Sequence, residues 1–215
     1  MKRFVINLKR RPERLLNFFK RCPYPRETFD VIEAFDGKFP EQESRKERKM
    51  LSKFSESIEM GARGCSISHL RIWKKIVNEN IPVAMIFEDD AQFNPNFSEF
   101  MDSLVLPENF NVVYFGGRFK ENFVVPSNHM ELVNDKVYRH IHKNQWSNPI
   151  HERTTHAYII TLKMAKFLIS VFEIKDSNGP IDHHIIHTMR DLDLVYHSTY
   201  PLVCWSPMNS ESDIR

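Results

Sequence analysis

The fold is decided by the stretch Pro82-Val83-Ala84-Met85-Ile86-Phe87-Glu88-Asp89-Asp90. Five apolar residues run from Val83 to Phe87 without a break, and three carboxylates follow at once. A short apolar run with β-branched and aromatic members is typical of a strand buried on both faces, although a buried helical segment has the same pattern. In open α/β sheets, ligands bind beyond the carboxyl ends of the strands. The carboxylates are therefore either a site for a divalent cation or a solvated acidic turn.

Length and composition indicate one α/β domain over residues 1–215 with a substantial core. Apolar residues make up 41% of the chain and charged residues 27%, which is typical of a globular protein. The formal net charge of +2 is too close to neutral to favour nucleic acid as the partner. No apolar run approaches the roughly 18 to 20 residues that span a bilayer, and the short apolar run at residues 4–8 predicts a first strand rather than a signal peptide.

The three cysteines, Cys22, Cys65 and Cys204, are odd in number and widely spaced. The sequence has no C-x-x-C motif, so it favours neither a disulfide framework nor a structural zinc site. This pattern fits a reducing compartment, and we expect a cytoplasmic or otherwise intracellular location. The missing signal sequence is equally compatible with a piece of a larger polypeptide.

Predicted strands and helices alternate along the chain in a βαβ rhythm. Apolar runs predict strands at residues 4–8, 28–35, 83–87, 111–115, 155–161 and 200–204. Amphipathic spacing predicts helices after Pro12, after the glycines at 61 and 64, at 96–104, at 162–172 and after Pro180. The highly charged residues 38–53 predict an exposed, mobile loop with one or more helical turns.

Two stretches carry candidate anion-binding features. The basic turn at residues 9–14 follows the first strand and leads into a helix, where backbone amides and arginines favour phosphate; the alternative is a solvated basic turn. At residues 61–73, two glycines precede the predicted helix. Glycine lets a backbone approach a ligand closely, but it also permits tight packing of a helix on a sheet.

The stretch from Gly179 to His187 adds a carboxylate and several imidazoles. Asp182 follows Pro180 at a predicted helix start, where Asp is a preferred capping residue, so it is either a cap or a functional group. His183 and His187 are four residues apart and can share a metal on one helix face. The H-E-x-x-H motif of zinc hydrolases is absent, and this argues against zinc hydrolysis.

Taken in order, six motifs resemble glycosyltransferase family 25, which includes lipooligosaccharide galactosyltransferases and procollagen hydroxylysine sugar transferases. They span nearly the whole chain: Ile6-Asn7-Leu8 with Arg11-Pro12-Glu13-Arg14, Gly64-Cys65 with Ser68-His69, Phe87-Glu88-Asp89-Asp90, Thr155-His156-Ala157-Tyr158, Pro180-Ile181-Asp182, and Pro201 with Ser212-Asp213-Ile214. One departure is that His183 and His184 follow Asp182, where family members often have an acidic or apolar residue.

The resemblance implies a GT-A-type fold, a Rossmann-like mixed sheet with helices on both faces. It also implies a UDP-sugar donor and a divalent metal, usually Mn²⁺. Glu88-Asp89-Asp90 stands at the position of the family's metal-binding motif, and Asp182 at a functionally important aspartate.

Site roles follow from this alignment of motifs. If the strand continues, Glu88 and Asp90 point to the same side, so we expect Asp90 as a direct metal ligand, Glu88 at the metal or the ribose, and Asp89 at the sugar hydroxyls. His187, or alternatively His184, is the expected third Mn²⁺ ligand, because imidazole suits Mn²⁺ better than Mg²⁺. Asp182 is the expected catalytic base or sugar-orienting group. The remaining expected donor contacts are Asn7, Arg14, Gly64, Ser68 and His69, of which His69 has core packing as its alternative.

The leading hypothesis is a metal-dependent transferase that moves galactose or glucose from a UDP-sugar to a hydroxyl of a saccharide or of a collagen-type hydroxylysine acceptor, with or without a galactose already attached. An inactive relative that only binds the UDP-sugar is the second hypothesis. A nucleic-acid-binding module that uses the basic residues at 9–14 and 45–49 ranks last, because glutamates interleave with them.

Overall fold

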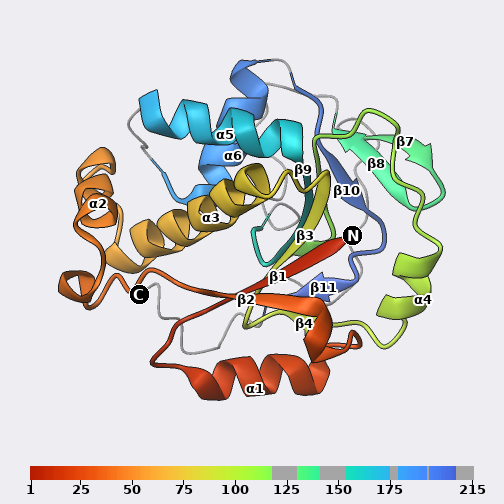
Figure 1. The fold of residues 1–215 in the computed structure, drawn as a ribbon. Helices are drawn as coiled ribbons and strands as arrows, with labels where there is room; N and C mark the ends of the chain where they lie inside the picture. Colours follow the sequence, from red (N-terminus) through yellow and green to blue (C-terminus); the bar gives the residue numbers. More distant parts are fainter. Residues whose placement is uncertain (118–129, 141–153, 175–178, 193, 207–215) are drawn as a thin grey trace.

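A computed structural model of the chain describes residues 1–117, 130–140, 154–174, 179–192 and 194–206 (Figure 1). Its centre is an eight-stranded sheet with the strand order β2-β1-β3-β9-β5-β10-β8-β7. The strands of this sheet are β1 (Lys2–Asn7), β2 (Phe29–Glu33), β3 (Val83–Glu88), β5 (Val112–Tyr114), β7 (Met130–Asn134), β8 (Val137–His140), β9 (Ala157–Thr161) and β10 (His197–Thr199). The Ser212-Asp213-Ile214 motif lies outside the described residues.

Parallel and antiparallel pairings are mixed in this sheet. Strand β1 pairs in parallel with both β2 and β3, so these three strands end at the same edge. Strand β9 runs antiparallel between β3 and β5. Strand β10 is parallel to β5, and the β7–β8 hairpin closes the far side. The predicted mixed sheet is therefore confirmed.

Helices cover both faces of the sheet, as predicted. Figure 1 shows α3, α5 and α6 together on one face and α1 on the other, beside a small sheet of order β4-β11-β6. No helix in the described ranges has the length and apolar composition to cross a membrane. The bounds of these elements are α1 (Pro12–Arg21), α3 (Met60–Asn78), α4 (Phe97–Asp102), α5 (Leu162–Ile174), α6 (Ile181–Asp191), β4 (Gln92–Phe93), β6 (Gly116–Gly117) and β11 (Cys204–Trp205).

Strand β3 contributes to the hydrophobic core on both of its faces. Ala84 and Ile86 face the cluster formed with α3, α5 and α6. Met85 and Phe87 face a second cluster, which is rich in phenylalanine and lies under α1 and α4. The prediction of a strand buried on both faces is confirmed, and this burial fixes the point at which the acidic residues leave the sheet.

The charged stretch at 38–53 is anchored to the body of the protein. It forms three short helical elements, which are the 3₁₀ helix Pro40–Gln42, α2 (Arg45–Arg48) and the 3₁₀ helix Lys49–Lys53; a further 3₁₀ helix, Arg26–Thr28, precedes β2. Arg71 of α3 donates hydrogen bonds to Glu43 and Glu47, each at 2.6 Å, and to the backbone oxygen of Glu33 at 2.7 Å. The expected helical turns are present, but these ion pairs hold them against α3.

Two predicted boundaries differ from the structure. Helix α3 begins at Met60, so the glycines at 61 and 64 lie inside the helix and not before it. The strand expected at 200–204 is interrupted at Pro201, with β10 before it and β11 after it. Proline has no backbone N–H to donate to a strand ladder, and this accounts for the break.

Candidate functional site

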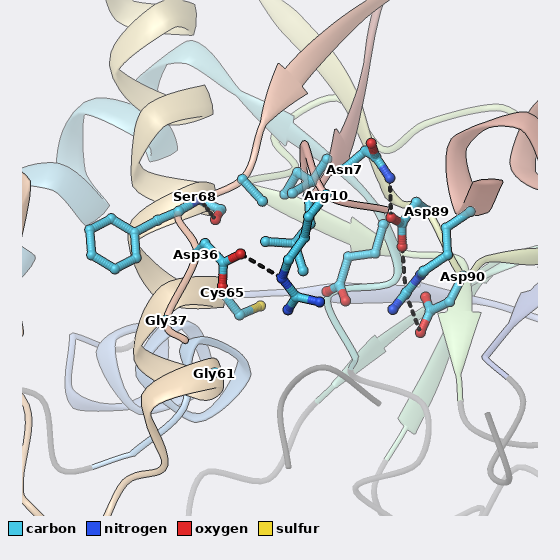
Figure 2. Close-up of a pocket in the computed structure, with 15 residues that line it drawn as sticks. Asn7, Arg10, Asp36, Gly37, Gly61, Cys65, Ser68, Asp89 and Asp90 are labelled. Atoms are coloured by element: carbon cyan, nitrogen blue, oxygen red, sulfur yellow. Dashed lines mark hydrogen bonds and ion pairs between the residues drawn. The ribbon is translucent and has the colours of Figure 1, made fainter. Parts of the chain in front are cut away.

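A hollow of about 600 Å³, open solvent included, lies at the edge where β1, β2 and β3 end. Its walls come from the turn after β1, the segment after β2, one face of α3 and the acidic turn after β3 (Figure 2). Its position beyond the carboxyl ends of parallel strands is the one in which open α/β sheets bind ligands. Its lining residues include Asn7, Arg14, Cys65, Ser68, Glu88, Asp89 and Asp90.

Asp89 is committed to contacts within the protein. Its Oδ1 lies 2.5 Å from Nη2 of Arg14, and its Oδ2 accepts a 2.6 Å hydrogen bond from Nδ2 of Asn7. Burial raises the pKa of Asp89 to about 6 against the opposing influence of Arg14 and Asn7. Asp89 thus joins the turn after β1 to the turn after β3, and the structure gives Asn7 and Arg14 the same bridging role.

Glu88, the last residue of β3, keeps one carboxylate oxygen within the protein. Its Oε1 accepts a 2.6 Å hydrogen bond from the Thr155 hydroxyl and lies 3.4 Å from Nε2 of His69. Burial opposes ionisation of Glu88, but His156 and the hydrogen bonds from His69 and Thr155 outweigh it and lower the pKa of this carboxyl. Glu88 is therefore an anion at neutral pH.

Asp90 carries a buried carboxylate oxygen with no hydrogen-bond partner among the described residues, its Oδ1. The other oxygen, Oδ2, accepts a 3.2 Å hydrogen bond from Ser206 and lies 3.8 Å from Nε2 of His156. A buried carboxylate oxygen without a partner costs about 1–3 kcal/mol or more unless a cation or a donor meets it. Asp90 therefore has one carboxylate oxygen that could bind a cation.

The ligand atoms of Glu88, Asp90 and His156 all lie within 4.8 Å of one another. Two carboxylates and one imidazole form a donor set that suits Mn²⁺. The expectation that the strand continues beyond Glu88 is wrong, because the chain turns at Asp89 and Asp90. The turn nevertheless brings Glu88 and Asp90 together and leaves Asp89 apart.

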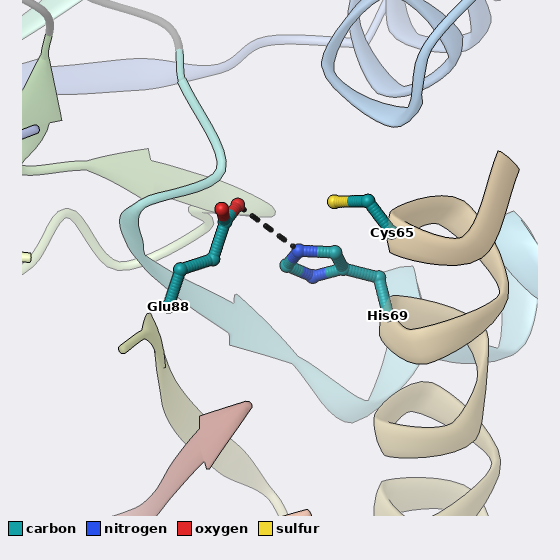
Figure 3. A group of neighbouring side chains, drawn as sticks. All are labelled: Cys65, His69 and Glu88. Atoms are coloured by element: carbon teal, nitrogen blue, oxygen red, sulfur yellow. Dashed lines mark hydrogen bonds and ion pairs between the residues drawn. The ribbon is translucent and has the colours of Figure 1, made fainter. Parts of the chain in front are cut away.

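A second group of potential ligands, Cys65, His69 and Glu88, shares the same carboxylate (Figure 3). Both ring nitrogens of His69 already have partners, since Nδ1 lies 2.8 Å from the Tyr158 hydroxyl and Nε2 faces Glu88. Burial, reinforced by neighbouring carboxylates, raises the pKa of the Cys65 thiol well above its usual value. A protonated thiol and a committed imidazole make this group the poorer metal site.

Backbone contacts hold the acidic turn in place. Arg21, the last residue of α1, donates to the carbonyl oxygens of Asp89 at 3.2 Å and of Ala91 at 3.4 Å. Asn7 also donates to the carbonyl of Arg11 at 3.0 Å. The position of the turn is thus set by side chains from both β1 and α1.

Gly64 and Ser68, which were expected to contact the donor, make close contacts within the protein. A Cβ on Gly64 would lie 2.8 Å from the carbonyl oxygen of Phe35, so this glycine lets α3 approach the segment after β2. The Ser68 hydroxyl donates to the Gly64 carbonyl at 2.7 Å and accepts from the Phe35 amide at 2.8 Å. Ser68 lines the hollow, but its proton is already used.

Helix α6 places Asp182 in its first turn, as predicted. Asp182 Oδ1 accepts a 2.9 Å hydrogen bond from the amide of His183. Helix α6 packs against α3, but Asp182 is not among the residues that line the hollow. His187 stacks on His183 with ring centroids 6.0 Å apart. Among the described residues, the group of potential metal ligands around Glu88 and Asp90 contains His156 and not His187.

No role was predicted from the sequence for His156, Thr155, Tyr158 or Arg21. Three of them stand in the Thr155-His156-Ala157-Tyr158 motif, so the signal was present although its meaning was not. Arg10 and Asp36 were also missed; they form an ion pair at 2.6 Å in the wall of the hollow. The acidic residue that follows β2 was the available signal for this pair.

Several known proteins are similar to parts of this chain. A Glycosyltransferase 25 family member of Drosophila pseudoobscura pseudoobscura is 32% identical over 135 residues, which is 55% of this chain and 21% of the relative. Procollagen galactosyltransferase 1-A of Xenopus laevis is 33% identical over 110 residues, 47% of this chain and 18% of the relative. The chain thus spans about a fifth of the length of these relatives.

Another relative is named as inactive. The Inactive glycosyltransferase 25 family member 3 of Mus musculus is 26% identical over 125 residues, 53% of this chain and 21% of the relative.

Among solved structures, a glycosyltransferase involved in the glycosylation of the major capsid of PBCV-1 is similar over 98% of this chain and 93% of that chain, with a TM-score of 0.46 and 10% sequence identity.

The family comparison covers most of the chain. The sequence model described as Glycosyltransferase family 25 (LPS biosynthesis protein) matches residues 1–185 of the 215. This stretch includes β1, the acidic turn, the Thr155–Tyr158 motif and Asp182. The chain therefore belongs to glycosyltransferase family 25.

Proposed function

We propose that this protein transfers a hexose, galactose or glucose, from a UDP-sugar to a hydroxyl of a saccharide or of a collagen-type hydroxylysine acceptor, free or already galactosylated. The observation that carries the proposal is the unpartnered Oδ1 of Asp90, set beside Glu88 and His156 at the carboxyl edge of the sheet. A buried anion in this pocket supports the binding of a ligand that requires a cation. Family membership narrows that ligand to a sugar donor.

Glu88, Asp90 and His156 are the residues that would hold Mn²⁺. When bound, the ion supplies Lewis-acid stabilisation of the negative charge on the diphosphate. The protein contributes the shape of the site: Thr155 and His69 fix Glu88, and Arg21 holds the backbone of the turn. His187, the third ligand expected from the sequence, gives way to His156 in this proposal.

Arg14, in the first turn of α1, places a cation directly against the acidic turn. It pairs with Asp89 at 2.5 Å and lies 3.7 Å from Asp90. A diphosphate that enters this space meets Arg14 on one side. Asp89 is then a positioning residue that orients Arg14.

Asp182 is the proposed general base. In the transfer step, an acceptor hydroxyl oxygen forms a bond to the anomeric carbon, the bond to the UDP oxygen breaks with its electron pair, and the hydroxyl proton passes to the Asp182 carboxylate. Its support is its place in the first turn of α6, which packs against α3. The Pro180 break before α6 sets where this carboxylate lies.

A protein that binds the donor without turnover is the second candidate, because one relative carries the word inactive in its name. Calorimetric titration of UDP in the presence of Mn²⁺ and then of EDTA tests the donor site. Binding that requires Mn²⁺, followed by hydrolysis of UDP-galactose or UDP-glucose, supports the transferase. Metal-dependent binding without hydrolysis or transfer supports the inactive relative, and no binding in either condition refutes both.

A further inference from the structure

A chain of buried polar groups leads from the interior of α3 to the acidic turn. Nε1 of Trp73 donates to the Tyr158 hydroxyl at 3.1 Å, that hydroxyl lies 2.8 Å from Nδ1 of His69, and Nε2 of His69 lies 3.4 Å from Oε1 of Glu88. Trp73, Tyr158 and His69 are all completely buried. His69 and Trp73 are four residues apart on α3, so both side chains face β9 and the end of β3.

The chemistry of the end groups fixes the direction of these hydrogen bonds. The indole of Trp73 can only donate, and the ionised carboxylate of Glu88 can only accept. His69 must therefore carry its proton on Nε2 to reach Glu88. In the neutral ring, Nδ1 is then an acceptor of a hydrogen bond from the Tyr158 hydroxyl, whose oxygen accepts one from Trp73. Every link has one donor and one acceptor when His69 is the neutral Nε2–H tautomer.

We propose that His69 is a positioning residue that, with Tyr158 and Trp73 behind it, holds Glu88 in the orientation required for a divalent cation. His69 and Thr155 both meet Oε1 of Glu88, and in this proposal Oε2 is the oxygen left to bind a cation together with Asp90. This inference rests on the proposed function for the identity of the ligand. The tautomer and the hydrogen-bond order do not depend on it.

The location of the network supports a role beyond packing. Buried polar networks are retained at a cost unless every member is satisfied, and this one ends on a carboxylate at the rim of the hollow. Partners behind a metal-binding side chain set its orientation, and removing them typically lowers metal affinity about 10- to 100-fold. The expectation of a donor contact at His69 is thus replaced by a contact made through Glu88.

The tautomer can be tested on the metal-free protein. A long-range ¹H–¹⁵N spectrum of ¹⁵N-histidine-labelled protein, assigned with a His69→Gln variant, should show His69 protonated on Nε2 alone. In Tyr158→Phe, which removes only the hydroxyl, this preference for one tautomer should weaken. Observation of the Nδ1–H tautomer, or of protons on both ring nitrogens, would overturn the proposed order of hydrogen bonds.

The positioning role is tested by Mn²⁺ titration followed by electron paramagnetic resonance. His69→Leu should weaken Mn²⁺ binding at least about tenfold, whereas His69→Gln, whose amide can still donate to Glu88, should remain within about threefold of the parent. Tyr158→Phe should fall between them. Tyr114→Phe, in which the neighbouring buried tyrosine loses its hydroxyl, is the matched control and should leave the affinity unchanged.

The outcomes separate this inference from the proposed function. Equal affinity in His69→Leu and in the parent, or equal loss in His69→Leu and His69→Gln, would reduce His69 to a core residue and refute the positioning role. A parent protein that binds no Mn²⁺ refutes both the proposed function and the cation role of Glu88. The tautomer spectrum then still decides whether the hydrogen-bond order is correct.

Discussion

Replacing Asp90 with Asn should make the metal-free protein more stable while it abolishes cation binding. Oδ1 of Asp90 is buried and has no partner within the described structure, and Glu88 and Asp89 add two further carboxylates next to it in the chain. The charge on Oδ1 lacks a donor in the absence of a cation, whereas Oδ2 has Ser206 at 3.2 Å and Arg14 at 3.7 Å. An amide of nearly the same shape removes that charge and keeps the side-chain volume.

The magnitude follows from the burial of this oxygen. An unsatisfied buried polar group costs about 1–3 kcal/mol, more if charged, and the amide recovers part of that. We expect the free energy of unfolding to rise by about 1 kcal/mol, equivalent to about 2–4 °C in Tm for a chain of this size. The apparent affinity for Mn²⁺ should fall at least about 100-fold, because a direct ligand matters at least as much as the groups behind it.

Asp36→Asn is the matched control in the same hollow. Asp36 pairs with Arg10 at 2.6 Å and accepts from the amide of Lys38 at 3.0 Å, so its neutralisation removes a satisfied ion pair. Its Tm should fall, by the equivalent of about 1 kcal/mol, and Mn²⁺ affinity should change little. Differential scanning calorimetry with EDTA and Mn²⁺ titration supply both numbers. An Asp90→Asn protein that is less stable than the parent, or that binds Mn²⁺ normally, would refute the reasoning.

Three further outcomes follow from the same geometry. Gly64→Ala should lower the free energy of unfolding by about 1–3 kcal/mol, because its Cβ would lie 2.8 Å from the Phe35 carbonyl; chemical denaturation that shows stabilisation would contradict this contact. For Asp89, burial raises the pKa from 3.8 to about 6, so the native state binds the proton more tightly than the unfolded chain. The stability of the metal-free protein should therefore fall as the pH rises from about 4 to 6, by up to about 3 kcal/mol, and urea unfolding of Asp89→Asn should lack this component. Asp182→Asn should bind UDP with Mn²⁺ normally yet turn over at least about 100-fold more slowly; normal turnover would leave Asp182 as a helix residue only.

Local pattern predicted the elements that are buried on both faces. The Val83–Phe87 run could form a strand between two apolar layers, and both layers are present. In the charged stretch, the sequence pattern did not predict the contacts. Residues 38–53 have the composition of a solvated loop, yet Arg71 pairs with Glu43 and Glu47. Nothing local indicates that an arginine more than twenty positions later would hold those glutamates.

In the candidate site, too, some residues could be predicted from the sequence and others could not. Glu88 and Asp90 could be predicted as partners because they are neighbours in sequence, although the geometry that joins them is a turn and not a continued strand. His156 could not, because its place depends on the antiparallel pairing of β3 with β9, in which Phe87 lies opposite Ala157. That register makes the amide of Glu88 donate to the carbonyl of His156 at 3.0 Å and so brings the imidazole to the carboxylates. The spacing of His183 and His187 did predict a shared helix face, but spacing within a helix cannot specify which neighbour that face meets. Long-range register, not residue type, therefore selects the histidine of the proposed cation site.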